Sequence, residues 1–275
     1  MDWNIQAAPW IAKEVPIELA HLPVRDELMN RAALQPGEAM VDIGCGSGGL
    51  SLVAADQVGA TGTVIAFDIA NAFVERARAR AAGLPQVTAI QGDAQSHDFS
   101  GLDCDAVVSL FGMMFFPDPT VAFANIAQAL KPGGRIHFVT WAGPEHNPWF
   151  SVPGRAMAGA MPEMPKPDPA APGPMAFANA AMVADLMAGA GFDHIASEAV
   201  DLHLTPPGTS EEISAMMLAV GPARGLIKTF GAPNDEDRLL STIGAAVAEG
   251  YSAFQTKDGI RVPARVIFYS GQRAA

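Results

Sequence analysis

The 275-residue sequence predicts an α/β protein with a doubly wound, mostly parallel sheet of seven strands and helices on both faces. Two observations lead to this prediction. Short runs of mostly apolar residues, typical of strands buried on both faces, alternate with helical stretches of about 10–12 residues. A glycine-rich segment directly follows the first of these runs and opens a helix, as in open α/β sheets that bind a ligand at the carboxyl ends of their strands.

The alternation of strands and helices begins at residue 39, breaks at residues 143–178 and resumes at residue 179. Seven segments are predicted as strands, namely Ala39–Cys45, Thr63–Ile69, Val87–Gly92, Asp105–Phe111, Arg135–Trp141, Ile195–Leu204 and Arg261–Tyr269. Six longer helices are predicted at Gly48–Val58, Asn71–Ala82, Thr120–Leu130, Asn179–Ala190, Ser210–Val220 and Asp235–Glu249, with a shorter one between the last two. The last strand alternates apolar and polar residues, so we expect it to be antiparallel and paired with Tyr251–Thr256 in a hairpin.

Three segments lie outside this pattern. Residues 1–38 are predicted to form one or two helices that cap the remaining domain, residues 39–275. Residues 143–178 contain nine of the 22 prolines, a density that argues against a long helix. We expect this stretch and the helical insert at 205–250 to form a lid over the carboxyl edge of the sheet, because long loops in compact domains are usually functional.

Composition narrows the classes of partner. The formal net charge of −12 disfavours a nucleic-acid substrate, since an acidic surface repels phosphate backbones. Two cysteines, Cys45 and Cys104, make a disulfide framework improbable, and no spacing suggests a metal site. The N-terminal MDWNIQAAPW does not resemble a signal peptide, and the longest apolar run is too short to span a bilayer. We therefore expect a cytoplasmic protein without membrane contact, with a homodimer left open.

A glycine segment predicts a nucleotide-binding site but does not distinguish between nucleotides. Its residues are Gly44-Cys45-Gly46-Ser47-Gly48-Gly49. Glycines permit unusual dihedral angles and close approach of the backbone to a ligand. Their spacing fits the dinucleotide pattern G-x-G-x-x-G, and equally the pattern G-x-G-x-G of S-adenosylmethionine (SAM) sites. An NAD(P)-dependent oxidoreductase is therefore one possible interpretation of the loop alone.

The neighbours of the loop favour SAM. Asp42, two residues before the loop, is unsuited to a pyrophosphate but suits a ligand that carries an ammonium group. Asp68, 24 residues after Gly44, ends the second strand, where a carboxylate accepts hydrogen bonds from ribose hydroxyls. Asp93 and Ala94 end the third strand, where an acidic and a small residue suit the amine and the ring of adenine.

These segments resemble the successive motifs of the class I SAM-dependent methyltransferases. The resemblance covers residues 39–142 through VDIGCGSGG, FDI, QGDA, SLFGMMFFPDP and LKPGGRIHFVTW, and extends more loosely to a bacterial small-molecule branch. It implies a Rossmann-like methyltransferase fold with SAM as the cofactor. The cofactor-binding residues that it implies are Asp42, Gly44, Cys45, Gly46, Asp68, Ile69, Asp93, Ala94, Ser109, Leu110 and Phe111.

The same resemblance guides the expected chemistry. The polar Asn/Asp-Pro-Pro-aromatic signature of nucleobase and amide methylation is absent after the fourth strand, which favours a small, largely hydrophobic acceptor. His146, after the fifth strand, is the candidate general base, with His97 a weaker one and His137 more typical of a structural residue. Trp141, Trp149 and Phe150 are candidates to cage the acceptor or, through cation–π contact, the sulfonium. A SAM-binding protein without methyl transfer remains an alternative.

Overall fold

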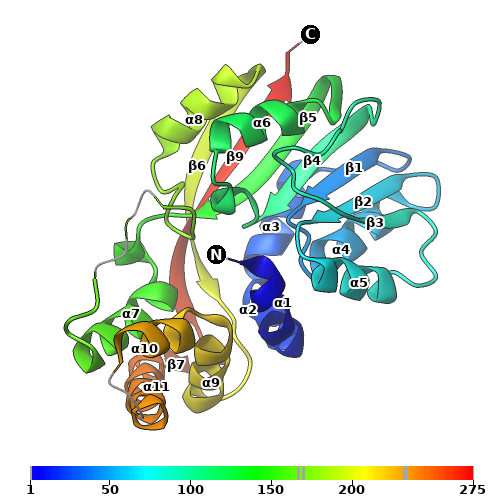
Figure 1. Cartoon of the computed structure of the whole chain (residues 1–275). Coiled ribbons are helices and arrows are strands. Elements are labelled where there is room, and N and C mark those ends of the chain that lie inside the picture. The colour runs from blue at the N-terminus through cyan, green and yellow to red at the C-terminus, as the bar shows by residue number, and fades with distance from the viewer. Residues whose placement is uncertain (1, 166–167, 169–170, 232–234, 275) are drawn as a thin grey trace.

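The computed structural model describes residues 2–165, 168, 171–231 and 235–274. Its centre is one seven-stranded sheet with the strand order β3-β2-β1-β4-β5-β9-β6 (Figure 1). The strands are β1 (Ala39–Ile43), β2 (Thr63–Asp68), β3 (Val87–Gln91), β4 (Cys104–Leu110), β5 (Leu130–Trp141), β6 (Phe192–Leu204) and β9 (Val262–Arg273). Only β9 runs antiparallel to its neighbours β5 and β6 in this sheet. The predicted fold class is confirmed.

The middle strands are apolar because both of their faces are covered. Val41 of β1 pairs with Ile65 of β2 on one side and with Val107 of β4 on the other, and all three side chains are buried. A strand buried on both faces has no solvent side to alternate with, so its sequence is a continuous apolar run. The edge strand β6 alternates between polar and apolar residues instead, since one of its faces meets solvent.

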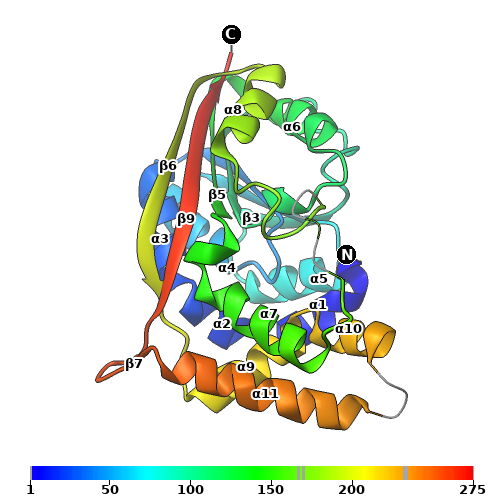
Figure 2. The same cartoon turned by 90° about the vertical axis from the view of Figure 1, so that its left-hand side faces the viewer.

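Helices cover both faces of the sheet (Figure 2). One face carries α3 (Leu22–Ala32), α4 (Gly49–Val58) and α5 (Asn71–Arg80), and the other carries α6 (Pro119–Ala127) and α8 (Ala180–Gly189). Side-chain caps begin two of these helices: Asp118 accepts from the amide of Val121, and Asn179 accepts from that of Ala181.

The N-terminal segment forms three helices, where the sequence predicted one or two: α1 (Trp3–Ala12), α2 (Glu14–Ala20) and α3. The extra breaks fall at Lys13 and His21, whose backbone angles leave the helical range. Helix α1 lies against α5, where Ala7 packs on Phe73, and it reaches α9 (Ser210–Val220) through a 3.1 Å bond from Trp10 Nε1 to the Val220 carbonyl. The segment therefore joins the sheet to the helical insert.

A second helical layer lies beyond the carboxyl end of β5 and consists of α7 (Pro148–Ala160), α9, α10 (Ala223–Phe230) and α11 (Glu236–Ser252) (Figure 1). The predicted helices of the insert are confirmed. The expectation that residues 143–178 exclude a long helix was wrong, because α7 has 13 residues. Pro148 opens that helix, where its missing N–H costs nothing. The interior Pro153 is compensated by packing of the buried Trp149 and Val152.

The predicted hairpin near the C-terminus has different partners from those expected. Gln255–Thr256 (β7) pairs with Gly259–Ile260 (β8), while residue 251 still belongs to α11. Strand β9 pairs instead with β5 and β6, because its alternating apolar side chains complete the main core. Two short 3-10 helices, η1 (Met113–Phe115) and η2 (Pro144–His146), follow β4 and β5. Among the helices of the described ranges, none has both the length and the hydropathy for a bilayer crossing.

Candidate functional site

The glycine loop connects β1 to α4 at the carboxyl edge of the sheet. Gly44, Gly46 and Gly48 have positive φ angles of 72°, 53° and 88°, which side chains rarely adopt. A Cβ on Gly44 would lie 2.9 Å from Cα of Gly112, in the loop after β4. A Cβ on Gly46 would meet nothing within 4 Å. Gly44 is therefore required by packing between two loops, and Gly46 faces open space.

Two carboxylates predicted to bind a cofactor lie in the strands next to this loop, Asp42 in β1 and Asp68 at the end of β2. Asp42 is buried, and the Ser51 hydroxyl of α4 donates to it at 2.6 Å. Burial raises the pKa of Asp42 to about 7. Asp68 accepts from the amide of Gly46 and from the amide of Ala70, both at 2.9 Å, and burial raises its pKa as well. Asp68 thus ties the loop to the end of β2.

The residues after β2 and β3 differ in exposure. Ile69 is 44% exposed, which is unusual for an isoleucine beside a buried strand. Asp93 closes a turn by accepting from the amide of Gln95 at 2.9 Å, and Ala94 is buried next to it. The amide of Asn125 on α6 donates to the Ala94 carbonyl at 2.9 Å and holds this turn in place.

Three predicted residues belong to the end of β4. Ser109 is fully buried; its hydroxyl donates to the Ile43 carbonyl at 2.7 Å and accepts from the Gly112 amide at 3.2 Å, so it joins the ends of β1 and β4. Leu110 is half-buried, and Phe111 has a positive φ of 64°. Such an angle is strained for an aromatic residue and usually marks a functional or tightly packed position.

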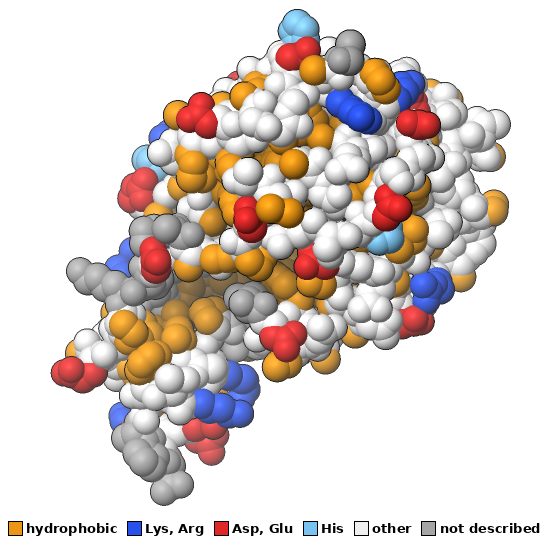
Figure 3. Space-filling view, turned by 45° about the horizontal axis from the view of Figure 1, so that its top comes forward, with side chains coloured by type: hydrophobic (Ala, Val, Ile, Leu, Met, Phe, Trp, Pro, Cys, Tyr) orange, Lys and Arg blue, Asp and Glu red, His pale blue; other side chains and the backbone are white. Residues whose placement is uncertain are grey.

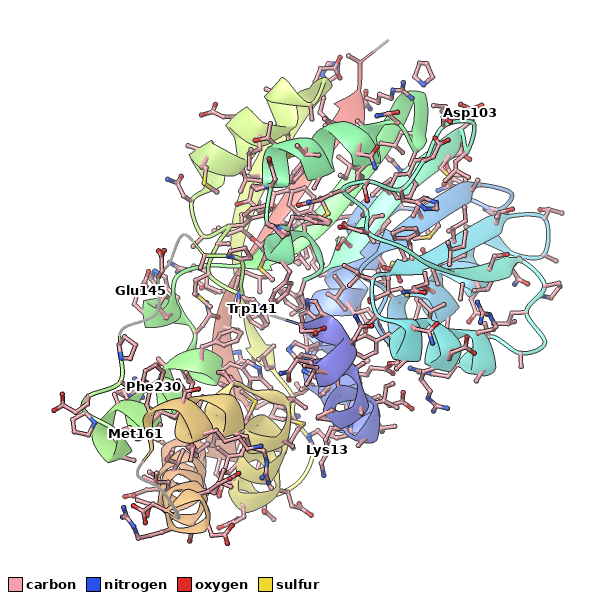
Figure 4. All side chains as sticks on the ribbon, in the orientation of Figure 1. Lys13, Asp103, Trp141, Glu145, Met161 and Phe230 are labelled. Carbon is pink, nitrogen blue, oxygen red and sulfur yellow. The ribbon has the colours of Figure 1, made fainter. Side chains whose placement is uncertain are left out.

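Phe111 belongs to an aromatic cluster that also contains Trp141, Trp149 and His21. The ring of Phe111 is stacked on Trp141 at 4.3 Å with an interplanar angle of 1°. The His21 imidazole meets the edges or faces of the three other rings at centroid distances of 5.6, 5.7 and 5.6 Å. Figure 4 places Trp141 where the carboxyl end of β5 approaches the N-terminal helices. Figure 3 shows a hollow with many hydrophobic side chains between the sheet and the helical layer.

Helix α2 also contacts the glycine loop. Arg80 of α5 donates through Nη2 to Glu18 Oε2 at 2.9 Å and through Nη1 to the Ser47 hydroxyl at 3.1 Å. The Ser47 hydroxyl in turn lies 3.3 Å from Glu18 Oε1. A Cβ on Gly49 would stand 2.6 Å from the same oxygen, so a larger residue there would displace the Glu18 carboxylate. The N-terminal cap is therefore bound to the loop by a charge network.

The three histidines considered in the sequence lie outside the aromatic cluster. They are the candidate base His146, the weaker candidate His97 and His137, which the sequence favours as structural. The His146 side chain on η2 is 43% exposed and lies 3.5 Å from Glu145, so the structure does not bring it to the aromatic cluster. His97 packs between Phe67 and Phe99. His137 lies in β5, where burial lowers its pKa to about 4. Over the part of the chain that the structure describes, no group of three His, Cys, Asp or Glu side chains is placed to hold a metal ion.

Comparison with known proteins assigns the family. A family model described as a methyltransferase domain matches residues 40–134. The nocamycin O-methyltransferase of Saccharothrix syringae is 32% identical over 200 residues, which cover 67% of this chain and 70% of that relative. The chain belongs to the SAM-dependent methyltransferases. This membership confirms the sequence-based resemblance.

Two further likenesses were found, one of sequence and one of fold. The aklanonic acid methyltransferase DauC of Streptomyces sp. (strain C5) is 35% identical over 120 residues, 43% of this chain and about half (54%) of that relative. The structure of the YcgJ protein from Bacillus subtilis superposes with a TM-score of 0.57 at 17% identity, covering 91% of this chain and 98% of the other, a likeness of fold alone.

Sequence reasoning missed three residues of this methyltransferase that the structure brings to the site. His21 and Glu18 come from the N-terminal cap, and Gly112 follows β4. No spacing pattern identifies the first two, since their partners are distant in the chain. A signal did exist for Gly112, because a glycine directly after a buried strand often marks a close backbone approach. Cys45, predicted to bind the cofactor, has its side chain buried among Ala66 and Ala77, and burial raises its pKa.

Proposed function

We propose that this methyltransferase transfers the methyl group of SAM to a small, largely hydrophobic acceptor. One observation supports the acceptor class above all others. The aromatic cluster lies at the carboxyl ends of β4 and β5, and its Phe111 directly precedes Gly112, the residue packed against Gly44 of the glycine loop. A largely buried aromatic cluster beside a nucleotide loop suits a planar organic molecule rather than a charged polymer.

The site residues fit SAM as the cofactor. The loop presents Gly44 and Gly46 with backbone angles that allow close approach, and Gly44 is exposed. The exposed side of Ile69 offers an apolar surface for the adenine ring, beside Asp68 for the ribose. Asp93 provides a hydrogen-bond acceptor for the adenine amine, and Ala94 provides a small side chain beside the adenine ring. We propose that these residues contact the cofactor.

A supporting role is proposed for three of the buried predicted residues, namely Asp42, Ser109 and Cys45. Asp42 binds Ser51, and Ser109 binds the Ile43 carbonyl, so both hold the loop and its neighbouring strand in position. Cys45 fills the space between the loop and α5. Leu110 stays a proposed lining residue.

Chemistry at this site requires positioning and exclusion of water more than proton transfer. Bound SAM supplies a methyl group on a cationic sulfur. Holding the acceptor in line with that methyl group contributes several kcal/mol, up to about 7–11 in favourable systems. We propose that α1, α2 and the described parts of the segments 143–178 and 205–250 cover the site, since Trp10 joins α1 to the helical insert and Glu18 joins α2 to the glycine loop. Residues 166–167, 169–170 and 232–234 of these segments lie outside the described residues.

Isothermal titration with SAM, S-adenosylhomocysteine and NAD tests the cofactor. We expect both sulfur ligands to bind and NAD not to bind. The variant Asp68→Asn should weaken SAM binding about tenfold, because an amide offers one oxygen to the two N–H groups of Gly46 and Ala70. Asp98→Asn is the matched control, since Asp98 is exposed and binds only Ser100.

Release of labelled methyl from SAM across a panel of planar phenols, enols and carboxylic acids tests the transfer. Methylation of at least one hydrophobic member is expected. NAD binding without SAM binding would contradict the cofactor assignment. Tight SAM binding without methylation of any panel member would instead favour a SAM-binding protein that does not transfer methyl groups.

A further inference from the structure

His21 is the most unusual polar residue near the proposed acceptor site. It lies at the junction of α2 and α3, it is only 9% exposed, and aromatic rings from three other elements surround it. Those rings are Phe111 after β4, Trp141 at the end of β5 and Trp149 on α7. A polar ring in such surroundings needs a defined hydrogen-bonding role, because burying an unpaired polar atom costs free energy.

The protonation of the ring follows from its one hydrogen bond. Nδ1 of His21 lies 2.8 Å from the Ile17 carbonyl oxygen, and a carbonyl can only accept, so Nδ1 carries the hydrogen. Burial lowers the pKa of His21 to about 4, and the ring is therefore neutral at pH 7. In a neutral imidazole with hydrogen on Nδ1, Nε2 bears the lone pair. Within the described ranges no group donates to Nε2.

The backbone around His21 is held from outside the helix. Thr205, just after β6, donates its hydroxyl to the Leu19 carbonyl at 2.9 Å and its amide to the Ala20 carbonyl at 3.0 Å. Glu18, on the same helix, contacts Ser47 of the glycine loop. Helix α2 thus touches the proposed cofactor loop through Glu18, while His21, directly after this helix, belongs to the aromatic cluster.

We propose that His21 is the general base of the reaction and that the acceptor is a planar phenol or enol. This inference rests on the proposed function and specifies its substrate class. The acceptor hydroxyl donates its hydrogen bond to Nε2 while its ring packs against Phe111 and Trp141. Three aromatic walls and a single hydrogen-bond acceptor match a flat, hydrophobic molecule with one hydroxyl group.

The proposed methyl transfer forms one bond, breaks one bond and moves one proton. The hydroxyl oxygen forms a bond to the methyl carbon as the carbon–sulfur bond breaks, and that electron pair remains on sulfur. The hydroxyl proton passes to Nε2 and gives an imidazolium, which then releases the proton to water. A weak base suffices, because the hydroxyl proton becomes strongly acidic as the oxygen acquires the methyl group.

The first test needs neither SAM nor turnover. Isothermal titration of the ligand-free protein compares 1-naphthol with 1-methoxynaphthalene, which has the same rings but no hydroxyl hydrogen. One hydrogen bond of ordinary strength predicts about fivefold tighter binding of 1-naphthol. Equal binding of the two probes, or no binding of either, overturns the proposal. This comparison uses the wild-type protein, so it does not depend on any variant folding.

The second test uses His21→Asn, whose side-chain amide can still donate to the Ile17 carbonyl but has no atom at the position of Nε2. We expect this variant to lose the preference for 1-naphthol, to bind SAM as the wild type does, and to lose at least about a hundredfold in kcat with a smaller change in KM. His194→Asn, at an exposed side chain on β6, should leave all three unchanged. A retained preference in His21→Asn overturns the proposal. Failure of the wild-type protein to bind SAM would instead count against the proposed function.

Discussion

Gly44 and Gly46 allow two causes of glycine dependence to be separated in one loop. Both have positive φ angles, 72° and 53°, so alanine at either position pays the cost of a left-handed conformation, about 1–2 kcal/mol. They differ in the space around the added Cβ. At Gly44 it would lie 2.9 Å from Cα of Gly112, and at Gly46 it would meet no atom within 4 Å.

The contact at Gly44 adds a second cost. Carbon atoms in proteins pack at about 3.5–4.0 Å, so the two loops would have to separate by more than half an ångström. Forced overpacking of this kind costs about 1–3 kcal/mol. We therefore expect Gly44→Ala to lower the free energy of unfolding by about 2–5 kcal/mol, and Gly46→Ala by about 1–2 kcal/mol.

Urea unfolding of both variants, followed by circular dichroism, measures this difference. SAM titration is the second readout: Gly46→Ala should weaken binding at least about tenfold despite its smaller loss of stability, because its Cβ stands on the open side of the loop. Losses of stability within about 0.5 kcal/mol of each other, or a larger loss at Gly46, would refute this account of the loop packing.

Two further predictions concern buried and half-buried carboxylates. Burial raises the pKa of Asp42 to about 7, so the folded chain holds a proton that the unfolded chain releases near pH 4. Stability should therefore fall as pH rises from about 4 to 7, by up to about 1.4 kcal/mol per unit, and Asp42→Asn should remove this slope in urea unfolding at several pH values; equal slopes would contradict the assignment. Glu18→Gln, which weakens the pair with Arg80, should cost about 1 kcal/mol and speed proteolysis of the N-terminal cap, whereas Glu75→Gln, in an exposed pair, should do neither. Similar cleavage rates in the two Glu→Gln variants would argue against the charge network as the connection of the cap.

Local chemistry explains why the strands and the loop were predictable. A strand covered on both faces must be largely apolar, and Ala39–Ile43 is apolar at every position except Asp42, without reference to any partner. A loop that approaches a nucleotide needs glycine at particular positions, so Gly44 and Gly46 are evident from spacing alone. Both features depend on residues that are neighbours in the chain.

Helix α7 shows where such local rules fail. The prolines between residues 143 and 178 disfavour a helix by themselves, yet the chain forms one because Pro148 occupies its first turn and Trp149 gains burial against the helical layer. The burial of Trp149 depends on α11, about a hundred residues away, whose Tyr251 donates to the Trp149 carbonyl at 2.9 Å. The helix propensities of the residues around Trp149 do not include the stabilisation that comes from this distant contact.

The sequence by itself determined the sheet, the glycine loop and the methyltransferase family, because those depend on short-range patterns of hydrophobicity, glycine and carboxylates. Tertiary structure alone decided which histidine meets the aromatic cluster. His146 looked suitable from its place after β5 but lies exposed beside Glu145, while His21 reaches Trp141 across 120 positions of the chain. The physical reason is that the environment of a side chain is set by packing between distant segments, and that packing leaves no periodic trace in the sequence around a single residue.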